Sequence, residues 1–187
     1  YKNKFKSNLM SKVILVNKNN KKIGLEDKLV AHQKGLLHRA FSILIFNSKK
    51  EFLLQRRASN KYHTPGLWTN TCCSHPKENE SYDEAIHRRL NEEMGMKCKL
   101  EQSYSFVYKS KLSKNLIEHE HDSVFIGQTN DIPIINKNEV SEFKYISINE
   151  LKTELKIKPN NFTPWFKMII NNLDDSFFES KTFKINA

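Results

Sequence analysis

The segment from Ser81 to Gly95 constrains the fold most, because both ends of one helix are marked in it. Ser81 and Glu84 have the spacing of a capping box, in which two side chains satisfy free N–H groups at the start of a helix. Gly95 is suited to the left-handed residue that commonly ends a helix. The apolar runs on either side are short and are bounded by turn-forming residues. The sequence therefore predicts one helix over residues 81–94, placed between strands.

Short strands dominate the rest of the pattern. An apolar run at 40–46, the polar turn NSKK and a second run at 52–55 predict a β-hairpin. Two later helices are signalled, one by a capping box at 147–150 and one by Thr163-Pro164. Further strands are expected at 12–16, 67–73, 103–109, 119–127 and 143–146, with a short helical or irregular segment at 26–32 and a loop at 57–66. These elements predict an α/β fold with a mixed or antiparallel sheet flanked by helices, without the regular alternation of a Rossmann fold.

The length of 187 residues suits a single domain with one site. No apolar run approaches the roughly 18 residues that a membrane span requires, so no membrane partner is expected. Residues 1–9 lack the apolar core of a secretory signal and precede Met10. They are interpreted as a disordered extension, a cloning remnant or a piece of an organellar targeting peptide. We expect the folded domain to occupy residues 10–187.

Three cysteines, at positions 72, 73 and 98, do not form a disulfide framework. Their number is odd, and adjacent cysteines pair only with strain. The cysteine content therefore favours a reducing compartment and a cytoplasmic location.

The net charge of +10 raises nucleic acid as a partner. However, the 31 Lys and Arg residues include only five Arg, and the lysines are spread along the chain instead of forming one basic block. We expect a lysine-rich surface without a nucleic-acid function, with part of the charge serving an anionic small molecule. The pattern carries no signal for the oligomeric state.

The motif WTNTCCSHP at 68–76 is the most informative stretch for chemistry. Successive side chains of a strand point to opposite faces, so Cys72 and Cys73 face opposite ways and His75 shares a face with Cys73. One cysteine would then face a site and the other the core. The alternative is that both cysteines are small buried apolar residues, which is the common fate of a Cys.

The sequence EHEH at 118–121 offers a second polar group. The same alternation places Glu118 and Glu120 on one face and His119 and His121 on the other, so the four cannot bind one ion. Two carboxylates on one face indicate either open solvent or a cation between them.

His32 and His38 stand six residues apart around Gly35 and are expected on a bend. Together with His75 and the two glutamates, they would form an N/O ligand set suited to a divalent ion. Each histidine taken alone is more often a surface or core residue.

The predicted helix carries two i,i+4 pairs, Arg88–Glu92 and Arg89–Glu93, and ordinary ion pairs on a helix surface explain the first of them. The same segment resembles the Nudix box, with two departures. Ser74 replaces a Gly and Arg89 replaces a Glu, which argues against pyrophosphohydrolase chemistry because that chemistry uses clustered Glu to hold Mg²⁺. The residues at the positions of the box are Ser74, Glu80, Arg88, Arg89, Leu90, Glu92, Glu93, Gly95 and Met96.

The resemblance extends beyond the Nudix box to one particular family. The sequence resembles type I isopentenyl-diphosphate isomerase, a Nudix family, over about residues 12–170. The resemblance implies a Nudix-type fold and the interconversion of isopentenyl and dimethylallyl diphosphate in isoprenoid biosynthesis. It is carried, in order, by LLHRAFS, QRRASNK, PGLWTNTCCSHP, the altered Nudix helix, Glu118-x-Glu120 and Thr163-Pro-Trp165.

The resemblance also implies site residues. The catalytic divalent metal, Mg²⁺, Mn²⁺ or Zn²⁺, would be bound by His32, His38, His75, Glu118 and Glu120. Cys73 and Glu120 would be the proton-transfer pair, assisted by Tyr108. Glu93, with the Cys73 carbonyl, would hold a Mg²⁺ on the substrate diphosphate. The residues that would contact the diphosphate end are Lys28, Arg57, Lys61, Ser74 and Arg89.

Moving a double bond through a tertiary carbocation requires two proton carriers on opposite faces of the substrate. Trp165 is the candidate to stabilise the cation, since a desolvated indole face contributes ~2 kcal/mol or more. Its alternative role is packing at the start of a helix.

Two other functions stay open from the sequence. One is a Nudix hydrolase of a nucleoside diphosphate derivative. The other is a non-catalytic, RNA-associated Nudix-like module, which should expose aromatic side chains along a basic stripe. The Phe and Tyr residues of this chain instead fall mostly within apolar strand patterns.

Overall fold

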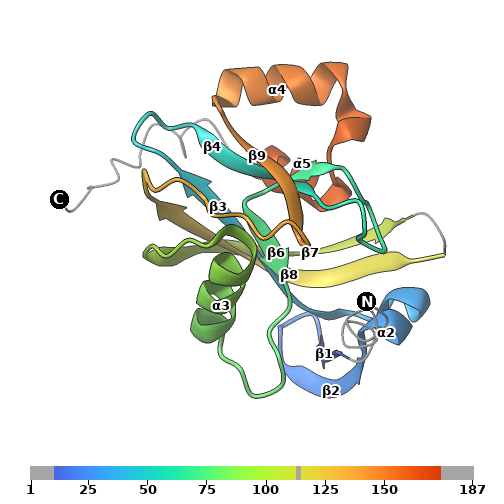
Figure 1. Cartoon of the computed structure of the whole chain (residues 1–187). Helices are drawn as coiled ribbons and strands as arrows, with labels where there is room; N and C mark the ends of the chain where they lie inside the picture. Colours follow the sequence, from blue (N-terminus) through green and yellow to red (C-terminus); the bar gives the residue numbers. More distant parts are fainter. Residues whose placement is uncertain (1–10, 113–114, 174–187) are drawn as a thin grey trace.

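The structure is a computed structural model, and it describes residues 11–112 and 115–173. Nine strands form one mixed sheet, and four α-helices accompany it in the described part of the chain (Figure 1). The strands are β1 (Lys12–Val16), β2 (Lys22–Asp27), β3 (His38–Phe46), β4 (Phe52–Arg57), β5 (Trp68–Thr69), β6 (Cys72–Ser74), β7 (Leu100–Lys111), β8 (Ile117–Gln128) and β9 (Val140–Ile146). The helices are α2 (Lys28–Lys34), α3 (Tyr82–Met94), α4 (Ile148–Ile157) and α5 (Pro164–Asn171), with a 3₁₀ turn at Pro159–Asn161.

Strand β3 organises the sheet because it pairs with four other strands. Along its whole length it runs parallel to β8, from His38 opposite Glu120 to Phe46 opposite Gln128. Its other edge is shared in turn by β1, β6 and β4, all antiparallel. Because β3 changes partners along this edge, the sheet divides into parts that share β3. Strand ends meet at the division, and a site can form there.

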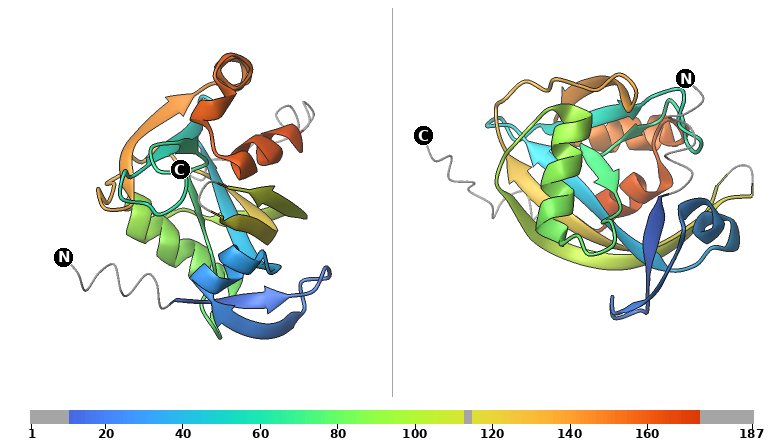
Figure 2. Two further views of the ribbon diagram at one scale, coloured as in Figure 1. Left: turned by 90° about the vertical axis from the view of Figure 1, so that its right-hand side faces the viewer. Right: turned by 60° about the horizontal axis from the view of Figure 1, so that its bottom comes forward.

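Helices cover the two sides of the sheet and enclose two separate apolar clusters. Helix α3 packs on one cluster through Ala85, Ile86 and Leu90, together with Cys72 of β6. Helix α5 closes the other cluster through Trp165 and Phe166, among others. The ribbon views show α3 and α5 on opposite sides of the strands (Figure 2). Burial of these large side chains against the sheet provides the main stabilisation of the fold.

Helix α3 confirms the prediction for residues 81–94. Both hydrogen bonds of the capping box are present, and Gly95 ends the helix with φ 64°. The hairpin of β3 and β4, the strands β7, β8 and β9 and the two later helices also form where they were expected. The mixed sheet confirms the predicted fold class.

One predicted strand was wrong in its extent, and one strand was missed. The segment 67–73, predicted as one strand, is divided into β5 and β6 because side chains take over the hydrogen bonding in between. Asn70 Nδ2 donates to the carbonyls of Ile43 and Cys72, and Thr71 Oγ1 donates to the carbonyl of Leu53 at 2.6 Å. Strand β2 was not foreseen, since its residues are mostly half-buried and do not alternate clearly.

No helix in the described ranges is long and apolar enough to cross a membrane.

Candidate metal and catalytic site

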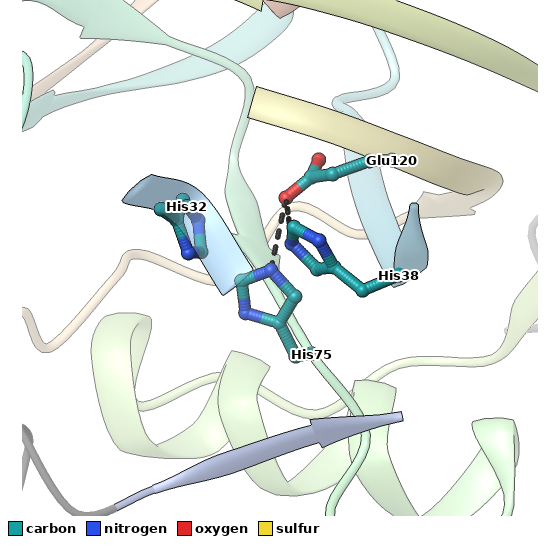
Figure 3. Close-up of side chains that lie close together, drawn as sticks. All are labelled: His32, His38, His75 and Glu120. Carbon is teal, nitrogen blue, oxygen red and sulfur yellow. Dashed lines mark hydrogen bonds and ion pairs between the residues drawn. The ribbon is translucent and has the colours of Figure 1, made fainter. Parts of the chain in front are cut away.

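Three histidines and one glutamate from different elements converge on one point (Figure 3). His32 lies on α2, His38 begins β3, His75 follows β6 and Glu120 lies on β8. One ligand atom from each lies within 4.8 Å of the others. Glu118, the fifth ligand predicted from the sequence, is not among these four residues, and neither is His119 or His121.

The turn between His32 and His38 depends on Gly35, which ends α2 with φ 60°. A Cβ on this residue would lie 3.0 Å from Ile117 Cγ2, so the turn requires both the left-handed conformation and the small residue. The turn brings the two imidazole rings to a centroid distance of 4.8 Å. The predicted bend is therefore present and pairs the two histidines.

Backbone carbonyls orient both rings. His32 Nδ1 lies 2.5 Å from the Lys28 carbonyl, and His38 Nδ1 lies 2.8 Å from the Leu36 carbonyl. A carbonyl only accepts, so each Nδ1 carries a hydrogen, and the Nε2 of each ring is turned toward the cluster. Both Nε2 atoms are buried without a hydrogen-bond partner.

Carboxylates face the Nε2 atoms of the histidines. Glu118 Oε2 lies 3.0 Å from His32 Nε2, and Glu120 Oε1 lies 3.5 Å from His38 Nε2 and 2.9 Å from His75 Nε2. At these distances each nitrogen–carboxylate pair needs a shared proton or a metal ion between its two atoms. The donor set of imidazole nitrogens and carboxylate oxygens fits a divalent metal ion.

The charges of the cluster support the same interpretation. Burial and the charge of Glu118 would raise the pKa of Glu120, but the neighbouring His38 and His75 hold it at about 2. Burial also opposes ionisation of Glu118, whose pKa is nevertheless held well below its ordinary value by His32 and His63. Burial, with the positive charge of Lys28, lowers the pKa of His75 to about 3. The cluster therefore presents two carboxylates beside a neutral His75.

Tyr108 and Cys73 border the cluster from two strands. Tyr108 Oη donates a 2.6 Å hydrogen bond to Glu120 Oε2, the oxygen that does not face His75. Cys73 packs on the α5 side of the sheet and Cys72 on the α3 side, which confirms the predicted alternation. Burial raises the pKa of the Cys73 thiol to about 12, although Arg57 acts to lower it.

A second group of polar residues gathers the predicted diphosphate contacts. Lys28 begins α2, Arg57 ends β4, Lys61 follows in the loop, and Arg89 lies on α3. Burial, followed by the positive charge of Lys61, lowers the pKa of Lys28 to about 8, and Arg89 acts in the same direction. These cations are therefore close enough to repel one another. Ser74 is the last residue of β6 and is half-buried.

Glu93 lies within this second group and is 3% exposed. It pairs with Arg89 and accepts a 2.8 Å hydrogen bond from Gln55 Nε2. Arg89 also approaches Glu139 at 3.4 Å, and Lys61 forms an ion pair with Glu139. The expected ion pair between Arg88 and Glu92 is present at 3.3 Å, on the outer side of the helix.

Trp165 lies at the start of α5, beside Arg57 of the cation group and near His63. It is 3% exposed, and its Nε1 is buried without a hydrogen-bond partner. The Arg57 guanidinium lies 5.4 Å from the centre of the Trp165 ring. The packing role and a role toward a substrate are thus both compatible with its position.

His63 was missed by the sequence analysis. Its Nε2 lies 3.1 Å from Glu118 Oε1, and its ring centroid lies 5.9 Å from that of His32. Burial lowers the pKa of His63 to about 4. The available signal was a histidine directly after Lys61 and Tyr62 in a loop already expected to contact the substrate.

The fold and the matching residues are those of a NUDIX domain, since the family model described as "NUDIX domain" matches residues 36–166. The isopentenyl-diphosphate Delta-isomerase 2 of Photorhabdus laumondii is 50% identical over 161 residues, covering 86% of this chain and 91% of that protein. The isopentenyl-diphosphate Delta-isomerase of Pectobacterium atrosepticum is 46% identical over 166 residues, covering 89% and 93%. The chain belongs to the isopentenyl-diphosphate Delta-isomerase family.

A solved structure of the same fold is that of DR0079 from Deinococcus radiodurans, with a TM-score of 0.65. It is 19% identical and covers 79% of this chain and 90% of its own. At this identity the similarity concerns the fold alone.

Proposed function

We propose that the chain interconverts isopentenyl and dimethylallyl diphosphate. Relatives at 44–50% identity that are named isopentenyl-diphosphate Delta-isomerases support this proposal. The observation that carries it is the arrangement of Cys73 and the Tyr108–Glu120 pair around a buried His/Glu cluster, beside a group of cations. Such a site combines two proton carriers with a place for an anionic substrate.

The reaction moves one proton on and one proton off the substrate. A proton added to the terminal methylene carbon of isopentenyl diphosphate leaves a tertiary carbocation at the branched carbon. Loss of a proton from the adjacent carbon on the diphosphate side then forms the new double bond. No atom besides the two protons is exchanged, so the chain needs no oxidant or second substrate.

We assign the added proton to Tyr108 and Glu120. The Tyr108 hydroxyl is buried, and its pKa is raised well above its ordinary value by burial and by the charge of Glu120. It therefore carries a proton while it donates the 2.6 Å hydrogen bond to the ionised Glu120, and this is the proton that the pair would deliver to the methylene carbon. General acid–base catalysis of this kind contributes roughly 10²–10⁴-fold in rate.

Cys73 is assigned the opposite role, the removal of the proton. A thiolate is the active form of a cysteine base, and the raised pKa of Cys73 shows that burial opposes it. The positive charge of Arg57 acts in favour of the thiolate. Cations that arrive with the substrate would act in the same direction, which would link thiolate formation to substrate binding.

The ligands proposed for the catalytic ion, Mg²⁺, Mn²⁺ or Zn²⁺, are His32, His38, His75, Glu118 and Glu120. A divalent ion there would supply the positive charge that keeps Glu120 ionised and oriented. Glu93, with the Cys73 carbonyl, would hold a Mg²⁺ that accompanies the diphosphate.

The phosphate oxygens would be bound by Lys28, Arg57, Lys61, Ser74 and Arg89. Arg residues suit this task because the planar guanidinium makes paired hydrogen bonds to phosphate. Trp165, buried at the other side of Arg57, would shield the carbocation from water and stabilise its charge. The three cysteines are free thiols, which suits a reducing, cytoplasmic setting.

The competing functions find less support. A Nudix hydrolase would need a carboxylate where Arg89 stands, and Arg89 is already paired with Glu93. An RNA-binding module would need exposed aromatic side chains, and none of the described Phe, Tyr or Trp residues is exposed. We therefore expect a small diphosphate, and no nucleic acid, as the partner.

Turnover of isopentenyl diphosphate to dimethylallyl diphosphate by the purified chain tests the proposal. Conversion should occur, stop after chelation and return when Mg²⁺, Mn²⁺ or Zn²⁺ is added back. Release of phosphate or of a nucleotide from nucleoside diphosphate derivatives, with no isomerisation, would refute it in favour of a hydrolase.

A further inference from the structure

His63 is a buried histidine for which the roles assigned above leave no function. It lies in the loop between β4 and β5 and is 8% exposed. It is not one of the four residues whose ligand atoms lie within 4.8 Å of one another. Its nearest polar contact inside the site is the carboxylate of Glu118, at 3.1 Å.

The direction of this contact follows from the chemistry of the two groups. A carboxylate that binds a metal ion only accepts, so His63 Nε2 would carry the hydrogen and donate it to Oε1 of Glu118, 3.1 Å away. Arg57 Nη2 lies 3.4 Å from the same Nε2, but the His63 carbonyl, at 3.2 Å, is the acceptor that this guanidinium can use. The hydrogen bond then commits one oxygen of Glu118 and leaves the other, Oε2, turned toward His32.

Neighbouring side chains hold the ring of His63 in this orientation. The ring centroid lies 4.3 Å from that of Tyr62 and 6.1 Å from that of Trp165. Arg57 fixes the backbone of the same residue and stacks on Trp165. The donor is therefore placed by residues that border the proposed substrate end.

We infer that His63 is a positioning residue that orients Glu118 for the divalent ion without being a ligand itself. This inference rests on the proposed function only for the identity of the reaction, since the ion affinity of the cluster can be measured without substrate. Hydrogen-bond partners of metal ligands typically contribute 10–100-fold in metal affinity. The same order of effect is expected for His63.

Two substitutions separate the hydrogen bond from the packing of the ring. His63→Phe keeps an aromatic ring between Tyr62 and Trp165 but removes the donor. His63→Gln removes the ring but keeps an N–H group at a similar reach. Apparent affinity for Zn²⁺ is measured by competition with a chromophoric chelator, with the melting temperature of each variant recorded beside it.

His63→Phe should lose affinity by about 10–100-fold, and His63→Gln should stay within a few-fold of the unsubstituted chain. His121→Phe, at another buried histidine outside the cluster, should bind Zn²⁺ unchanged. The reverse pattern, with Phe tolerated and Gln not, would reduce His63 to a packing role and overturn the inference. Co²⁺ spectra give a second check, because a changed coordination spectrum in His63→Gln would make His63 a ligand and also overturn it.

Failure of the inference and failure of the proposed function are distinguishable. Equal Zn²⁺ affinity for His63→Phe and the unsubstituted chain would refute the role of His63 even if isomerisation proceeds. Absence of isomerisation by the unsubstituted chain would refute the function, while a selective loss of Zn²⁺ affinity in His63→Phe would still support the role of His63.

Discussion

The two polar groups of the site are built in opposite ways. In the His/Glu cluster, backbone carbonyls hold His32 and His38 so that their Nε2 atoms face carboxylates. These two buried nitrogens have no hydrogen-bond partner. In the cation group, side chains already neutralise one another, as Arg89 does with Glu93 and Glu139. The donor atoms of the first group fit a divalent ion between them, whereas the second group carries its own counter-charges.

This difference predicts different responses to substitution. Removing one member of the His/Glu cluster leaves the others facing one another with no alternative partner, so the loss should be steep. Removing one cation of the second group leaves other cations nearby, so the loss should be graded and should appear in substrate binding. Salt should weaken the second group more than the first, because Lys28, Lys61 and Arg89 are only half-buried, whereas His32, His38 and Glu120 are buried.

The largest effect is expected where the two groups meet, at Cys73, whose thiol responds to charges from both groups. Cys73→Ala should lower kcat by about 10²–10⁴-fold with little change in melting temperature. Cys72→Ala, on the opposite face in the apolar cluster, should keep most of the activity and cost some stability. Steady-state isomerase assays and thermal denaturation of both variants provide the measurement. A dead Cys72→Ala beside an active Cys73→Ala would reverse the assigned faces.

The next effect concerns the cation group alone. Arg89→Ala should raise KM for isopentenyl diphosphate by roughly 10–100-fold, the equivalent of one or more hydrogen bonds to a charged group at ~1.5–3 kcal/mol. Zn²⁺ affinity at the His/Glu cluster should not change. Arg88→Ala is the matched control, because Arg88 pairs with Glu80 and Glu92, whereas Arg89 shares only Glu92 with it and also pairs with Glu93 and Glu139. Equal KM values for both variants would leave Arg89 with a helix-stabilising role only.

The sequence predicted the parts of this comparison that depend on local pattern. The ends of α3, the opposite faces of Cys72 and Cys73, and the pairing of Glu118 with Glu120 all follow from spacing over a few residues. The residues themselves suggested an N/O ligand set of histidines and glutamates, whereas the residue roles came from the family resemblance.

The missed features depend on contacts between distant parts of the chain. His63 acquires its role from a carboxylate 55 residues later, and the break between β5 and β6 depends on Asn70 reaching Ile43. Periodicity carries no signal for either contact. Glu139, which pairs with Lys61 and Arg89, was missed for the same reason.

A moderate effect is expected at the turn that pairs His32 with His38. Gly35→Ala should lower the free energy of unfolding by about 1–3 kcal/mol, because a side chain at positive φ is strained and meets Ile117. It should also weaken Zn²⁺ binding. Gly66→Ala is the control, since Gly66 has φ 73° with nothing within 4 Å of an added Cβ. Chemical denaturation and Zn²⁺ titration should show a loss of stability in both variants but a loss of affinity only in the first.

The smallest effect is a pH dependence that arises at Lys28, a cation of this group whose pKa is lowered to about 8. Below that pH the ammonium is charged and attracts the diphosphate. As the pH rises through about 8 the charge is lost, so kcat/KM should fall, by roughly fivefold if the attraction is worth about 1 kcal/mol. Bound diphosphate stabilises the charged form, so kcat should change less than kcat/KM over the same range. Lys28→Arg, which stays charged, should remove this decline, and Lys28→Met should show the low value already at pH 7. A decline near pH 8 that persists in Lys28→Arg would assign it to another group and leave the cations of this region without a titrating member.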